Sequence, residues 1–114
     1  MTAPVEIALE RRGGTVIAHV GGEIDMTNAG HVRDELLESI PNGALAVVIE
    51  LERCRYLDSA GTEVVFDLSR RLGRRRQDLR LVLPAGSPLT RVLELTDVAS
   101  AAQIHESMNS ALAG

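Results

Sequence analysis

The sequence RYLDSAGT at residues 55–62 is the most informative stretch of the chain, because a strand-like pattern ends there and a helical pattern begins. Before it, residues 44–51 are almost continuously apolar and rich in β-branched side chains, which is typical of a strand covered on both faces. After it, apolar residues recur at helical spacing, at Val64, Val65, Leu68 and Leu72. The sequence therefore predicts a strand, a short connection and a helix, with Ser59 as the N-cap whose hydroxyl accepts from a first-turn N–H.

The residues before this junction predict a hairpin and a helix. Residues 5–10 alternate between apolar and polar, and Gly13-Gly14 supplies a tight turn into the apolar residues 16–20, which favours an antiparallel pair. A helix is expected after Asp25, and residues 41–43 end it. Its apolar face is predicted to contain Ala29, Val32, Leu36, Leu37 and Ile40.

The residues after the junction continue the alternation of helices and strands. A strand is predicted at residues 79–83, and Ser87-Pro88 is read as an N-cap and first residue of a third helix with a stripe at residues 89–96. A weak strand is expected at residues 103–104, before a short helix at residues 108–112. We therefore expect an α/β fold with a mixed four- to five-stranded sheet, an N-terminal antiparallel hairpin and about four helices.

Composition limits the class of protein. The chain has 114 residues, 45% hydrophobic and 25% charged, which predicts one soluble domain over residues 1–114. A net charge of -4 and only 2% aromatic residues argue against direct binding to nucleic acid or to an anionic membrane. The sequence contains no apolar run that could span a bilayer and no signal-like N-terminus, so a cytoplasmic protein is expected.

Several kinds of site are excluded or disfavoured by residue type. All 12 basic residues are arginines, so a P-loop, a Schiff-base enzyme and a phospho-acceptor receiver domain each lack their lysine. Single histidines at positions 19, 31 and 105 have no metal-ligand spacing, and we expect neither a metal nor a cofactor. The only cysteine, Cys54, is read as a small buried hydrophobe rather than a redox site. The arginines between Arg70 and Arg76 are read as solvated charges at a helix end.

Ser59 has three readings on residue type alone. A catalytic serine is disfavoured, because no Gly-x-Ser-x-Gly elbow surrounds it and no histidine lies nearby in the sequence. Plain helix capping and a regulatory role both remain open. The acids Glu23, Asp25 and Asp58 could form a carboxylate group for acid–base chemistry, but nothing in the sequence requires them to converge on a substrate.

A second segment favours the regulatory reading. Gly22-Glu23-Ile24-Asp25 ends a strand and leads into a helix, as does the segment before Ser59. If the two strands are parallel neighbours, Asp25 and Ser59 lie at the same edge of the sheet.

Gly22-Glu23-Ile24-Asp25, followed by Leu57-Asp58-Ser59-Ala60-Gly61, resembles the STAS domain of anti-sigma factor antagonists, and residues 89–96 are similar to the third-helix segment of that family. The resemblance covers essentially the whole chain. It implies a protein whose unphosphorylated form binds an anti-sigma factor, which is a serine kinase, and so releases the sigma factor. Phosphorylation at Ser59 would switch it off, and a serine phosphatase would reset it.

The resemblance also implies that residues 22–27 and 58–62 form the docking face that contacts the partner. The positions implied are Gly22, Glu23, Ile24, Asp25, Thr27, Asp58, Ser59, Ala60, Gly61 and Thr62. Two departures from the family pattern are Ala60, where a second Ser or Thr is frequent, and Glu50, where an aspartate is commoner. The first leaves Ser59 as the main acceptor, with Thr62 a minor one.

Two other functions remain as alternatives. One is a STAS module that senses a small ligand or nucleotide within a larger signalling assembly, which would need a pocket near Asp25 and Ser59. The other is a hydrolase that uses Ser59, which would need a histidine within hydrogen-bond reach.

Overall fold

Strand β2 (Thr15–Ile24) is central to the fold in the computed structural model, which describes residues 3–113. On one side it pairs antiparallel with β1 (Glu6–Arg12), as the hairpin pattern predicted. On the other side it pairs in parallel first with β3 (Ala46–Glu50) and then, beyond a register shift at Gly22, with β4 (Cys54–Leu57). One strand therefore joins the main sheet to the short strand that precedes Ser59.

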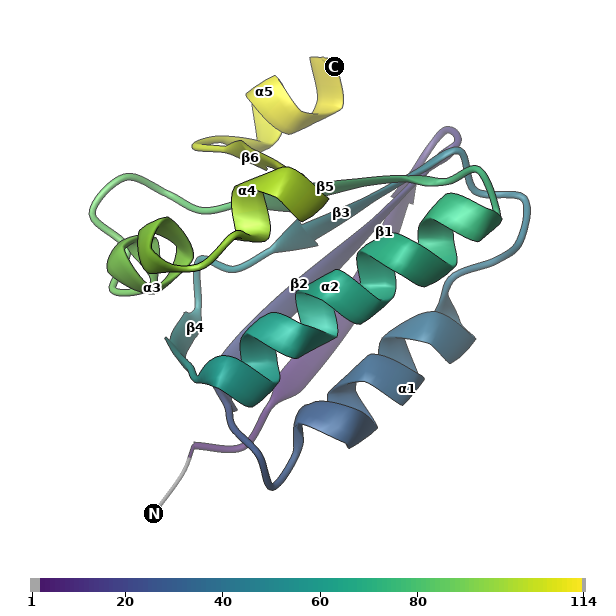
Figure 1. The fold of residues 1–114 in the computed structure, drawn as a ribbon. Coiled ribbons are helices and arrows are strands. Elements are labelled where there is room, and N and C mark those ends of the chain that lie inside the picture. The colour runs from purple at the N-terminus through teal and green to yellow at the C-terminus, as the bar shows by residue number, and fades with distance from the viewer. Residues whose placement is uncertain (1–2, 114) are drawn as a thin grey trace.

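The remaining elements complete a mixed sheet with helices on both faces. The main path runs β1-β2-β3-β5-β6, with β5 at Asp78–Val82 and β6 at Gln103–His105. Figure 1 shows α1 and α2 side by side across one face of the sheet. The helices are α1 (Ala29–Ser39), α2 (Ser59–Arg74), α3 (Thr90–Leu95), α4 (Val98–Ala101) and α5 (Met108–Ala113).

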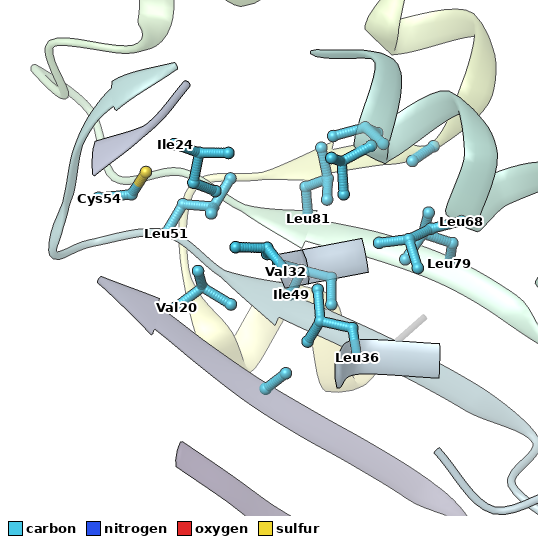
Figure 2. Packing of buried hydrophobic residues seen from close by; sticks show 14 of the residues in the cluster. Val20, Ile24, Val32, Leu36, Ile49, Leu51, Cys54, Leu68, Leu79 and Leu81 are labelled. Carbon is cyan, nitrogen blue, oxygen red and sulfur yellow. The ribbon is translucent and has the colours of Figure 1, made fainter. Parts of the chain in front are cut away.

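The main core lies between the sheet and the α1/α2 layer. The predicted stripe of α2 is buried, as is the predicted face of α1, and both pack with β3 residues such as Val47 and Ile49. Figure 2 shows part of this cluster, with Leu36 of α1 and Leu68 of α2 turned toward strand residues. A smaller cluster on the opposite face joins Ala111 of α5 to Ile17, Val48 and Val82. The helices are therefore held by their apolar stripes.

The structure corrects the predicted elements in three places. Within residues 3–113 the sheet has six strands rather than four or five, because residues 54–57 form a separate strand. Residues 98–101 form a short helix that the sequence pattern did not predict. Ser87 is not the N-cap of α3, which begins at Thr90. The Ser87 hydroxyl instead accepts from the Leu89 N–H at 3.1 Å, capping a turn that precedes the helix. The predicted tail strand and helix are confirmed.

None of the helices within residues 3–113 combines the length and the apolar composition needed to cross a bilayer.

Candidate functional site

The ends of β2 and β4 bring the two sequence motifs together. Ile24 and Leu57 are register partners in parallel strands, and the Asp58 N–H donates to the Ile24 carbonyl at 3.3 Å. Asp25 and Ser59 therefore follow at the same sheet edge, as predicted, although β4 rather than β3 is the neighbour of β2 there. This edge lies where α2 begins, near the β4 label in Figure 1.

Asp58, not Ser59, is the N-cap of α2, which corrects the sequence-based assignment. Its backbone is extended, at φ -94 and ψ -168, and one carboxylate oxygen accepts from the Gly61 N–H at 3.1 Å. The other oxygen accepts from the Met26 N–H at 3.3 Å. One side chain therefore caps α2 and also fixes the β2–α1 loop, and we call this arrangement the Asp58 clamp.

Ser59 is the first residue of α2 and is exposed. Within residues 3–113, its hydroxyl makes no hydrogen bond. The positive end of a 16-residue helix lies directly beneath it and favours negative charge there. The serine is thus accessible to a partner and is not needed as the cap.

The neighbouring hydroxyl is held inside the fold. Thr62 is 5% exposed, and its hydroxyl donates to the Ser59 carbonyl at 2.8 Å. This arrangement leaves Ser59 as the accessible hydroxyl of the motif and disfavours Thr62 as a second acceptor.

The β2–α1 loop is ordered by its own polar side chains. The Asp25 carboxylate accepts from the Thr27 N–H at 2.8 Å and from the Thr27 hydroxyl at 2.5 Å. Asn28 accepts from the Asp25 N–H at 3.0 Å and donates to the Glu23 carbonyl at 2.9 Å. Sequence reasoning missed Asn28, although asparagine commonly bonds nearby backbone groups in loops.

Gly22 and Glu23 position the N-terminal segment. Gly22 has φ +95, and a Cβ atom there would lie 2.2 Å from the Pro4 carbonyl oxygen. The Glu23 carboxylate accepts from the Ala3 N–H at 3.1 Å. Both residues therefore hold residues 3–5 against the site.

The ten predicted partner-binding residues differ in exposure. Thr27 and Ser59 are exposed, whereas Ile24, Gly61 and Thr62 are buried. The half-buried members are Gly22, Glu23, Asp25, Asp58 and Ala60. The buried residues can shape the docking face only by fixing its backbone.

A comparison with known protein families identifies the family of this chain. The family model for the STAS domain matches residues 6–111. The chain belongs to the STAS domain family. It is 25% identical over 117 residues to the anti-sigma-F factor antagonist RsfB of Mycobacterium tuberculosis, which covers 100% of this chain and 93% of that protein.

Solved structures share the fold of this STAS domain. An anti-sigma factor antagonist from Mycobacterium paratuberculosis aligns with a TM-score of 0.79 at 23% identity, over 99% of this chain and 97% of that one. The antagonist SpoIIAA in its unphosphorylated form aligns with a TM-score of 0.72 at 21% identity, over 94% and 93%. Both likenesses concern the fold alone.

The geometry of this STAS domain does not favour the two alternative functions. His19, His31 and His105 each contact acidic or polar groups elsewhere, and none reaches Ser59. A groove of about 860 Å³ crosses the sheet face around His19, and a second of about 330 Å³ lies beside α4. Neither groove is lined by Asp25 or Ser59.

The two remaining sequence readings concern Cys54 and the arginines of α2. Cys54 is buried, at 1% exposure, and burial raises the pKa of its thiol, as expected of a core residue. Arg71 and Arg74 lie in the last turn of α2, where cations complement the helix dipole, and Arg70 pairs with Asp67. Both readings agree with the structure.

Removing the Asp58 clamp is expected to destabilise the STAS domain. The Asp58→Ala variant loses the cap and the Met26 bond, and we expect a loss of about 1–2 kcal/mol in the free energy of unfolding, measured with urea. Asp58→Asn separates the two contributions, because its single amide oxygen can still cap α2 while its NH2 group cannot accept from the Met26 N–H, and its stability is expected to lie between those of the parent and Asp58→Ala. Equal stability of Asp58→Ala and the parent would contradict the clamp.

His19 joins three strands and predicts a pH dependence. Its Nε2 lies 2.7 Å from Glu10 and its Nδ1 lies 3.0 Å from Glu50, and both bonds form together only when the imidazolium donates from both nitrogens. The pKa of His19 is raised, mainly by its hydrogen bond to Glu50 and secondly by its hydrogen bond to Glu10. The pKa of Glu10 is lowered, mainly by its hydrogen bond with His19, and the nearby Arg12 lowers it further.

Because its folded pKa is raised, His19 stabilises the domain fully below its unfolded pKa of about 6.5, and this contribution is lost as pH rises through the folded value. His19→Gln is therefore expected to be about 1 kcal/mol less stable than the parent near pH 6, a modest figure because solvent screens the half-exposed ring. The difference should shrink near pH 9. Urea unfolding at both pH values tests this, and a deficit that does not change with pH would contradict it.

Proposed function

We propose that this STAS domain is an anti-sigma factor antagonist whose unphosphorylated form binds an anti-sigma factor that is also a serine kinase. Binding releases the sigma factor, and phosphorylation of Ser59 by the kinase ends the interaction. A serine phosphatase restores the binding form. The observation that carries the proposal is that Ser59 is the exposed first residue of α2, next to an aspartate that takes over the capping, so that no hydrogen bond within residues 3–113 occupies the serine hydroxyl.

The relatives support this assignment by their names. RsfB is named an antagonist of anti-sigma-F factor, and its similarity extends over the whole of this chain. SpoIIAA has been solved in unphosphorylated and phosphorylated forms, which align with TM-scores of 0.72 and 0.62. For that protein, both states keep a fold that resembles this one.

The position of Ser59 indicates how a phosphate would act. A phosphoserine carries nearly two negative charges at pH 7, and the N-terminus of α2 stabilises negative charge. Phosphorylation is therefore expected to leave the fold intact. We expect phosphorylation to weaken binding of the partner, because it adds a dianion next to Asp25 and Asp58 on a face that previously offered a neutral hydroxyl.

The direct test is phosphorylation by the host's own anti-sigma kinases. The protein is incubated with each kinase and ATP, and the phosphate is located by mass spectrometry. We expect one phosphate, on Ser59, and none on the Ser59→Ala variant. The Thr62→Val variant is the matched control and should be phosphorylated like the parent. Phosphate at another residue would refute the assignment of the switch.

A further inference from the structure

Two exposed residues with large apolar side chains lie on the chain segments that the Asp58 clamp joins. Met26 is 81% exposed, and its N–H is the one that donates to the Asp58 carboxylate. Tyr56 is 48% exposed, precedes Asp58 by two residues and is the register partner of Glu23. Both therefore belong to the two chain segments that the clamp joins.

Neither side chain contributes to the interior. Met26 and Tyr56 are absent from both buried clusters and from the side chains packed against them. A polar residue at either position would keep the same core. Their exposure is thus not explained by the packing of the core. Exposed apolar side chains on segments next to a candidate site are candidates for contact with a partner protein.

The backbone that carries Met26 is already ordered. Hydrogen bonds fix Thr27 to Asp25, and Asn28 bonds to the backbone of Asp25 and Glu23. A loop held in this way loses little further backbone freedom when a partner binds. The methionine side chain can still adapt to the partner, because its unbranched thioether packs against irregular surfaces.

We infer that Met26 and Tyr56 are the apolar anchors of the docking face, and that the anti-sigma factor offers an apolar pocket beside the position that receives the Ser59 hydroxyl. This inference rests on the proposed function. Tyrosine and methionine are enriched in interface centres, and the polar residues Asp25, Thr27 and Arg55 supply a rim.

The anchors and the serine would then have separate roles. The apolar side chains supply affinity, whereas Ser59 supplies the switch. A phosphate on Ser59 would have to lose water beside the partner's apolar pocket, and an ionised group that loses water without a new partner strongly opposes binding. The same anchors would bring Ser59 to the kinase, so their loss should raise the KM for phosphorylation and leave kcat nearly unchanged.

The test compares Met26→Ser and Tyr56→Ser with Leu45→Ser as the matched control. Leu45 is 73% exposed but precedes β3, whose first residue pairs with Thr15 at the start of β2. It therefore lies about 30 Å from Met26, at the other end of β2. All three variants should fold like the parent, because the side chains are exposed. Each anchor variant is expected to weaken binding to the cognate anti-sigma factor at least about tenfold, and Leu45→Ser should not.

The outcomes separate this inference from the proposed function. If both anchor variants bind like the parent while Ser59→Asp does not, the anchors are wrong and the switch stands. If no anti-sigma kinase of the host binds or phosphorylates the parent, the proposed function fails and the anchors fail with it. If the variants alter only self-association, measured by sedimentation, the apolar pair is a contact between copies and the inference is overturned.

Discussion

Exchange of Ser59 for aspartate is expected to weaken binding to the cognate anti-sigma factor by about a hundredfold, which corresponds to about 3 kcal/mol. The hydroxyl is exposed and unbonded within residues 3–113, so the substitution changes the docking face rather than the interior. A carboxylate there adds charge next to Asp25 and Asp58, and a partner must remove its water. Isothermal titration or surface plasmon resonance with the purified anti-sigma factor measures the change.

Ser59→Ala is the control for this experiment. It removes the site of phosphorylation but adds no charge, and we expect it to bind like the unphosphorylated parent. Its stability should remain within about 0.5 kcal/mol of the parent, because no hydrogen bond is lost. If Ser59→Asp and Ser59→Ala both bind like the parent, Ser59 is not the switch.

Gly22→Ala is expected to be the most destabilising single substitution at the site. At φ +95 an alanine is strained by about 1–2 kcal/mol, and its Cβ would meet the Pro4 carbonyl oxygen at 2.2 Å. Relief of that contact would displace residues 3–5 and break the bonds of Ala3 with Glu23. We expect a total loss of about 3 kcal/mol in the free energy of unfolding.

Urea denaturation measures this loss as a lower midpoint with an unchanged slope. Gly43→Ala is the matched control, because a Cβ there meets nothing within 4 Å and the residue has no positive φ. It should change stability by less than about 0.5 kcal/mol. A Gly22→Ala variant as stable as Gly43→Ala would show that the tight backbone contact does not govern this end of β2.

The sequence alone predicted the main fold and the meeting of the two motifs at one sheet edge, because local patterns indicate the strands and helices that bring them there. The alternation of apolar and polar residues predicted the hairpin, and the apolar stripes predicted α1 and α2. The expectation of parallel neighbouring strands predicted that Asp25 and Ser59 lie at one edge of the sheet. The N-cap was assigned to the wrong member of the Asp58-Ser59 pair. Aspartate and serine cap helices about equally well, so only the extended backbone of Asp58 distinguishes them.

Other features could not be predicted because they depend on long-range register. Strand β4 has four residues, two of them exposed, and this is too short for a periodic pattern. The His19 bridge needs Glu10 and Glu50, which come from two different neighbours of β2. The β2–β4 register also determines which exposed residues lie on the segments that the clamp joins. The sequence alone therefore did not indicate a role for Met26 or Tyr56.

The burial of Cys54 gives the protein an intrinsic reporter of motion at this edge. It is the only cysteine, it lies in β4, and Figure 2 places it at the same end of the core as Ile24 and Leu51. Because the sulfur is buried, we expect a thiol reagent to react only when the structure around Cys54 opens transiently, and the labelling rate then reports the free energy of that opening. A partner seated on the edge would slow the labelling, and occupancy could be followed without attaching any probe in advance.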